Sequence, residues 1–166
     1  MEFENKIISK EINTLLYEKG KTLGTAESCT GGHIAEAIVA SPGSSNYFKG
    51  SIVSYVDEIK ERLLEVDPQV IAEKTAVCEE VAIAMVKGAC KILATDYAIS
   101  ATGFAGPGGG TRETPVGTIW LACGTPDDVV TLCLTEDDGR DKNISKAANQ
   151  ALQLFLNYLK EHPIED

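Results

Sequence analysis

The residues that could do chemistry gather first in one short stretch, residues 25–32, which read TAESCTGG. An amphipathic segment follows, so the pattern predicts a strand that ends in a glycine-rich turn and opens into a helix. Free N–H groups at such a turn, here those of Thr30, Gly31 and Gly32, can hold an anion. Ser28 stands at the same turn, where its hydroxyl can act as a nucleophile. The alternative is a helix N-cap, which is the commoner role of a serine in this position.

A nucleophilic serine needs a base, and neither histidine of the chain is a promising one. His33 lies in the predicted first helical turn, where the helix dipole disfavours its charged form, and His162 lies near the end of the sequence. A Ser-His-Asp triad is therefore poorly supported. Lysine is the remaining candidate, because Lys60 follows Tyr55 by one helical turn, and a lysine kept neutral by burial can take a proton from serine. The alternative, which composition alone favours, is that Lys60 is a solvated helix residue.

A second glycine-rich stretch, GFAGPGGG at residues 103–110, follows a predicted strand at 97–102. In an open α/β sheet ligands bind outside the carboxyl ends of the strands, so the two glycine-rich loops are predicted to border one pocket. The chain lacks a P-loop pattern, and Thr111 occupies the last glycine position of a dinucleotide fingerprint, so both nucleotide-binding classes are disfavoured. The alternative is that this loop is only a mobile connector.

Arg140 follows an acidic segment at the start of the last predicted helix. Its guanidinium can bind a phosphate or a carboxylate with two N–H groups, or it can pair with Asp137 and Asp138. Arg112 and Glu113 lie in the second glycine-rich loop, and we expect both to be solvated.

The elements that must position these residues alternate between helices and strands. The longest regular pattern is at 79–93, where apolar residues recur at every fourth position. Two late strands are separated by a short turn and are predicted to pair as a hairpin. The order indicates one three-layer α/β/α domain with a mixed sheet over residues 1–166. Helices are predicted at 5–18, 30–39, 57–64, 79–93 and 141–160, and strands at 21–26, 47–55, 97–102, 116–123 and 129–134.

Composition narrows the class of protein. The 166 residues carry a net charge of −10, which argues against a nucleic-acid partner but allows a small phosphorylated substrate. No apolar run approaches the roughly 20 residues of a membrane helix. The acidic start, MEFENK, lacks an apolar signal segment, so we expect a cytoplasmic protein without a membrane partner. The five cysteines form no C-x-x-C pair, which indicates neither a zinc site nor a disulfide framework, and most are expected to be core residues.

Taken together, these motifs resemble the CinA carboxy-terminal domain family. The matching segments occur in the family's order and cover nearly the whole chain. They are TAESCTGG at 25–32, PGSS at 42–45, YVDEIK at 55–60, AVCEE at 76–80, TGFAGPGGG at 102–110 and PVGT at 115–118. The family includes stand-alone nicotinamide-nucleotide amidases of the PncC type.

The resemblance implies hydrolysis of the carboxamide of nicotinamide mononucleotide to nicotinic acid mononucleotide and ammonia, by a homodimer and without a metal or other cofactor. It implies that Ser28 is the nucleophile, Lys60 the general base and Tyr55 the residue that orients this base. Direct proton transfer needs Ser28 Oγ and Lys60 Nζ within about 3.2 Å of each other, or bridged by one water.

The resemblance also implies which residues position the substrate. It assigns this role to Thr102 and Arg140. The nucleotide phosphate needs glycine-loop amides or an arginine, and the glycine candidates are Gly103, Gly106 and Gly108.

This chain departs from the family pattern at several positions. Asp57 stands where the family usually has Asn, Cys78 where it has Ser, and Phe104 where it has a smaller aliphatic residue. Around Arg140 the order of residues is altered, and a second arginine that is common one turn later is missing. These departures leave two alternatives: a non-catalytic nucleotide-binding or competence-associated module, and an amidase for another small carboxamide.

Overall fold

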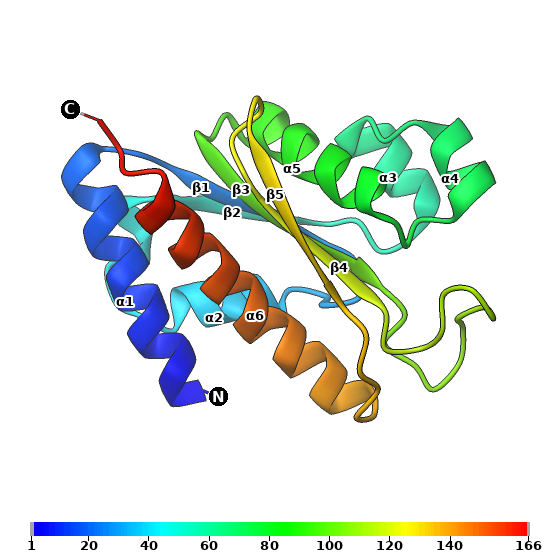
Figure 1. The fold of residues 1–166 in the computed structure, drawn as a ribbon. Coiled ribbons are helices and arrows are strands. Elements are labelled where there is room, and N and C mark those ends of the chain that lie inside the picture. Colours follow the sequence, from blue (N-terminus) through cyan, green and yellow to red (C-terminus); the bar gives the residue numbers. More distant parts are fainter. Residues whose placement is uncertain (1, 166) are drawn as a thin grey trace.

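The computed structural model describes residues 2–165, which fold around a five-stranded mixed sheet in the order β2-β1-β3-β4-β5 (Figure 1). Strands β2, β1 and β3 run parallel, whereas β4 and β5 are antiparallel and form the predicted hairpin. The mixed sheet predicted from the sequence is confirmed. The strands are β1 Leu23–Glu27, β2 Phe48–Val53, β3 Tyr97–Gly103, β4 Ile119–Gly124 and β5 Val129–Leu134.

Strand β1 lies between two parallel neighbours and is buried along its whole length. Leu23 belongs to the apolar core on one face of the sheet, and Ala26 belongs to the core on the other. Gly24 lets the side chain of Leu93 pack directly against β1, since an added Cβ at Gly24 would lie 2.6 Å from Leu93 Cδ1. A parallel strand buried in this way requires helices on both faces of the sheet.

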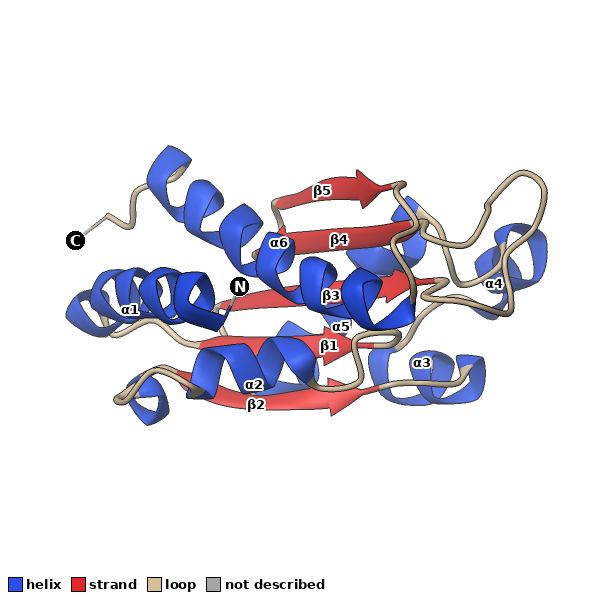
Figure 2. Ribbon diagram, turned by 90° about the horizontal axis from the view of Figure 1, so that it is seen from below, coloured by secondary structure: helices blue, strands red, loops and turns tan. Residues whose placement is uncertain are grey.

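The helices supply those two outer layers. Helices α1, α2 and α6 form the layer on the face of the sheet that is turned toward the viewer in Figure 2, and α5 covers the opposite face, with α3 and α4 packed against α5. The single three-layer α/β/α fold is therefore confirmed. The helices are α1 Glu2–Lys19, α2 His33–Val39, α3 Asp57–Leu64, α4 Pro68–Lys74, α5 Glu79–Leu93 and α6 Arg140–Glu161.

Helices α3 and α5 and strand β5 have the predicted bounds, but the sequence prediction missed helix α4. This helix has only seven residues, too few for a clear apolar period. Its start does carry a local signal, because the Asp67 side chain accepts from Gln69 N and Pro68 occupies the first helical position.

Two other boundaries differ because of glycines with positive φ. Helix α2 begins at His33 rather than at residue 30, because Gly31 and Gly32 adopt φ values of 53° and 103°. Strand β4 begins at Ile119 rather than at residue 116, because Gly117, with φ of 97°, lies in a turn. Residues 1 and 166 of the predicted domain lie outside the described residues, so the outer bounds of the domain remain a prediction.

Candidate active site

Both glycine-rich stretches leave the sheet at the same edge, because β1, β2 and β3 are parallel and their carboxyl ends lie together (Figure 2). Two backbone hydrogen bonds continue the pairing beyond the strand ends. Ser28 N donates to Ala101 O over 3.0 Å, and Ser54 N donates to Glu27 O over 2.8 Å. Ser28 is thereby held next to the segment that carries Tyr55.

Ser28 and Lys60 meet at the main-chain carbonyl of Tyr55. Ser28 Oγ donates to this oxygen over 3.4 Å, and Lys60 Nζ donates to it over 3.0 Å. Within residues 2–165 no hydrogen bond joins Ser28 Oγ to Lys60 Nζ, so the two groups share an acceptor without contacting each other directly. Ser28 does not cap helix α2, whose N-cap residue is Gly32, and the capping interpretation is therefore wrong.

Lys60 is buried although it lies in a charged run. Its side chain is on the inner face of α3 together with Leu64, and the residue is only 1% exposed, so the solvated interpretation is wrong. Burial lowers the pKa of Lys60, because the ammonium form loses hydration there. Asp57, 3.9 Å away, and Cys29 act in the opposite direction and raise this pKa. The net effect makes the amine a stronger candidate base near neutral pH.

Tyr55 contributes two different groups to this region. Its carbonyl accepts the two hydrogen bonds just described, whereas its phenol is exposed and accepts from Arg140 Nη2 over 3.3 Å. Arg140 Nη1 also donates to Gly106 O over 2.7 Å, so Arg140 links the segment before α3 to the second glycine-rich loop. Among the described residues no ion pair joins Arg140 to Asp137 or Asp138, and that pairing interpretation is wrong.

The residues at the base of the second glycine-rich loop are packed against the chain. Thr102 is buried, and its hydroxyl donates to Ala76 O over 2.9 Å. Gly103 has no space for a side chain, since an added Cβ would lie 2.6 Å from Ile119 Cγ1. Gly106 is buried and has φ of 84°, which favours glycine. Thr102, Gly103 and Gly106 were predicted to contact the substrate, and in the structure all three are packed closely against other residues of the protein.

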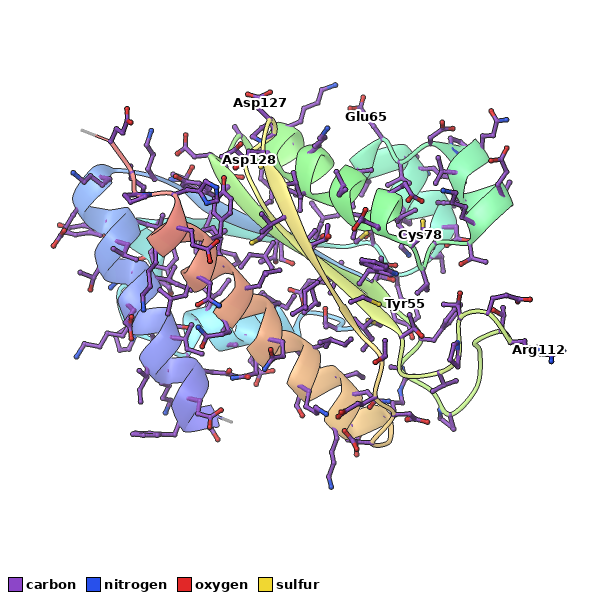
Figure 3. All side chains as sticks on the ribbon, viewed as in Figure 1. Tyr55, Glu65, Cys78, Arg112, Asp127 and Asp128 are labelled. Carbon is purple, nitrogen blue, oxygen red and sulfur yellow. The ribbon has the colours of Figure 1, made fainter. Side chains whose placement is uncertain are left out.

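The tip of the same loop is open. Gly108 is exposed, and an added Cβ there would meet no atom within 4 Å. Arg112 extends into solvent at the far end of the loop, away from Tyr55 (Figure 3), and Glu113 is also exposed, as predicted. The base of the loop is anchored to α6, because Asn143 Nδ2 donates to Ala105 O over 3.0 Å.

The sequence prediction missed Glu27, which organises the turn after β1. Its carboxylate is completely buried and accepts six hydrogen bonds within the described part of the chain. The sequence did carry a signal for this role. Glu27 ends a buried strand shortly before a helix, and carboxylates are favourable near helix N-termini. The donors are the hydroxyls of Thr25, Thr30 and Ser51 and the N–H groups of Gly32, Ile34 and Ala35.

These contacts change which amides of the turn are free. Gly32 N donates to Glu27, and Gly31 N donates to Ser28 O over 3.0 Å, so neither amide is free for an anion, contrary to the prediction. Among the described residues neither Cys29 N nor Thr30 N donates to a main-chain carbonyl, and Cys29 N interacts only with its own thiol, so these two N–H groups beside Ser28 are the candidates for a ligand.

The described residues contain no cluster of three or more His, Cys, Asp or Glu side chains that could hold a metal ion. All five cysteines are free thiols, and Cys29, Cys90 and Cys123 are buried in the core as expected. None of the helices in residues 2–165 combines the length and the apolar character needed to cross a membrane.

Comparison with known proteins gives a consistent family assignment. The model of the CinA C-terminal domain matches residues 5–159. A CinA-like protein of Cytophaga hutchinsonii is 40% identical over 159 residues, which are 96% of this chain and 38% of that protein. A CinA-like protein of Geobacter sp. is 56% identical over 108 residues, 65% of this chain and 26% of that protein. The chain thus spans less than two fifths of these curated relatives.

Solved structures show the same fold. A competence/damage inducible protein from Agrobacterium tumefaciens is 32% identical with a TM-score of 0.88, and the match covers 93% of this chain and 96% of that one. A competence-damaged protein (CinA) superfamily protein from Escherichia coli is 30% identical with a TM-score of 0.89, covering 93% of this chain and 90% of that one.

Proposed function

Because the chain belongs to the CinA C-terminal domain family, we propose that it is an amidohydrolase that converts nicotinamide mononucleotide to nicotinic acid mononucleotide and ammonia. The observation that carries the proposal is the convergence of Ser28 Oγ and the buried Lys60 Nζ on the carbonyl of Tyr55. A serine–lysine hydrolase needs a hydroxyl nucleophile, an amine base with a lowered pKa and N–H donors for the oxyanion. Ser28, Lys60 and the N–H groups of Cys29 and Thr30 are candidates for these three parts.

In the first step the neutral amine of Lys60 takes the proton of the Ser28 hydroxyl while Oγ bonds to the carboxamide carbon. Both side chains already contact one carbonyl oxygen, so a rotation of either side chain or one bridging water completes the transfer path. The carbonyl oxygen of the substrate becomes an oxyanion, for which the N–H groups of Cys29 and Thr30 are the donors.

The second half of the reaction returns the proton. Lys60 passes it to the amide nitrogen, the C–N bond breaks, and ammonia leaves an ester on Ser28. The amine, neutral again, takes a proton from a water that attacks this ester. The ester C–Oγ bond then breaks, Lys60 returns the proton to Ser28 Oγ, and the acid product releases its remaining proton to solvent as the free carboxylate, so the proposed cycle uses no metal or other cofactor.

We assign the nucleotide phosphate to Arg140 and to the open part of the loop around Gly108. Arg140 is exposed and uses two of its N–H groups for Gly106 O and the Tyr55 phenol, which leaves further donors of the guanidinium for a phosphate. We also propose a cytoplasmic homodimer in which residues 1–166 form one domain. The net charge of −10 supports a small-molecule partner rather than nucleic acid.

A second candidate is a nucleotide-binding module without turnover. The observation that favours it is that Ser28 and Lys60 share an acceptor but form no direct hydrogen bond in the described part of the chain. An amidase for another small carboxamide is the third, and a panel of carboxamides separates it from the first.

The test is ammonia release from nicotinamide mononucleotide, with calorimetric titration of the same nucleotide. We expect turnover by the wild type and its loss in Ser28→Ala and Lys60→Met. Lys91→Met is the matched control, because it removes a surface lysine whose contact is Glu65, 2.8 Å away. Tight nucleotide binding by a folded wild type that releases no ammonia across a wide pH range would overturn the amidase proposal in favour of the module.

A further inference from the structure

The carboxylate of Glu27 is unusual because it is buried without a cation. It is 0% exposed, and none of the ion pairs found among the described residues includes it. Burial of an unpaired carboxylate is unfavourable unless hydrogen bonds replace its hydration. Here six donors do so, and these hydrogen bonds explain an acid rather than an apolar residue at this position.

The two oxygens of Glu27 hold different parts of the structure. Oε1 accepts from Thr30 Oγ1 at 2.8 Å, Gly32 N at 3.1 Å and Ile34 N at 2.9 Å, and so defines the turn itself. Oε2 accepts from Thr25 Oγ1 at 3.1 Å, Ala35 N at 3.0 Å and Ser51 Oγ at 3.3 Å, and so ties the start of α2 to strands β1 and β2.

The Oε1 contacts have a direct consequence for Ser28, the next residue along the chain. The turn is closed on one side by Gly31 N donating to Ser28 O, and on the other by the three bonds to Oε1. With these amides occupied, Cys29 N and Thr30 N are the amides of the turn that donate to no other residue in the described part of the chain. Both lie directly after the serine.

We propose that Glu27 is a positioning residue for the nucleophile. Its carboxylate fixes the turn so that Ser28 Oγ faces the Tyr55 carbonyl and Lys60 while the Cys29 and Thr30 amides face the developing oxyanion. This inference rests on the proposed serine–lysine hydrolysis and deepens it. Glu27 itself does not contact the reacting atoms.

Two substitutions separate this role from a merely structural one. Glu27→Met keeps the length of the side chain but removes both acceptor oxygens, so the turn loses the contacts that fix it. Glu27→Gln keeps one acceptor oxygen. If the Gln oxygen takes the Oε1 position, its NH2 group faces one N–H donor, that of Ala35. In the opposite orientation the NH2 group would face two, those of Gly32 and Ile34, so the first orientation is favoured. The turn-facing contacts should therefore survive in the Gln variant. Ser51→Ala is the matched control, because it removes only one bond to Oε2.

The measurements are kcat per folded molecule and KM for ammonia release, with folding followed by thermal melting. We expect kcat of Glu27→Met to fall by about 100-fold with little change in KM, since a displacement of about 1 Å has that effect on a catalytic group. Glu27→Gln should recover most of the loss, and Ser51→Ala should be close to wild type. A folded Glu27→Met that melts earlier but keeps wild-type kcat would overturn the proposal, as would a rise in KM alone.

If Glu27→Met does not fold, Thr30→Val carries the test, because it removes one bond to Oε1 whereas Ser51→Ala removes one bond to Oε2. A kcat of Thr30→Val below that of Ser51→Ala at unchanged KM supports the proposal, and equal kcat values overturn it. If the wild type releases no ammonia, labelling of Ser28 by phenylmethylsulfonyl fluoride, followed by peptide mass spectrometry, replaces turnover. Label on wild-type Ser28 but not in Glu27→Met supports the positioning role although the substrate is wrong. Equal labelling, or none in the wild type, overturns it.

Discussion

Replacing Asp57 by Asn is expected to shift the pH dependence of turnover toward lower pH. In the proposed mechanism the base is neutral Lys60, so the rate rises with pH through the pKa of this lysine, which burial lowers. The Asp57 carboxylate, 3.9 Å from Lys60 Nζ, favours the charged lysine and raises that pKa. Because Asp57 is exposed, the interaction is worth about 1 kcal/mol, which moves the rising limb by about 0.7 pH unit.

The assay is kcat/KM for ammonia release across the neutral and alkaline range. Well below the midpoint of the limb, Asp57→Asn should be faster than the wild type by about fivefold, and added salt should reduce the difference. Glu58→Gln is the control, because it makes the same change of charge at a neighbouring residue whose partner is Arg62, 3.7 Å away. If the rising limb stays in place, moves to higher pH, or moves equally in Glu58→Gln, Asp57 does not raise the pKa of Lys60 in the way proposed here.

Three further predictions concern the groups around the site. Cys29→Ala should keep ammonia release near the wild-type rate, since burial raises the pKa of this thiol to about 12 and keeps it protonated; a large loss would make the thiol a participant. Gly88→Ala should destabilise the fold by roughly 2 kcal/mol in thermal melts and reduce turnover, because the new Cβ would lie 2.7 Å from Leu64 Cα in the helix that carries Lys60. An unchanged melt would contradict this. Lys60→Met should abolish turnover yet raise stability at neutral pH by roughly 1 kcal/mol, because the buried amine binds its proton less tightly than in the unfolded chain. This stability gain of Lys60→Met should shrink as pH rises toward the ordinary lysine pKa. A stability gain that does not change with pH would contradict the prediction.

The parts of the fold that followed from the sequence are those with a strong local period. Helix α5 has an apolar pattern that its burial explains, and its bounds were predicted correctly. The bounds of strand β5 were also predicted correctly, although none of its residues is fully buried. The start of α2 was misplaced because an apolar pattern does not report the backbone conformation of Gly31 and Gly32, which hold the chain in a turn until His33.

The site was harder to predict because its contacts join distant segments. The burial of Lys60 depends on how α3 packs, and composition favoured a solvated lysine. The donors to Glu27 come from residues as far apart as Thr25 and Ser51, so no spacing in the sequence reveals that one carboxylate gathers them. The partners of Arg140 likewise lie in loops remote from it along the chain.

In the proposed mechanism Ser28 forms an ester with the substrate. The most direct measurement is peptide mass spectrometry of the wild type, quenched with acid during turnover of nicotinamide mononucleotide. We predict an acyl adduct on the peptide that contains Ser28, and its absence from the Ser28→Ala variant. Two results together would contradict the mechanism: no adduct on Ser28 of the wild type during turnover, and ammonia release by Ser28→Ala as fast as that of the wild type.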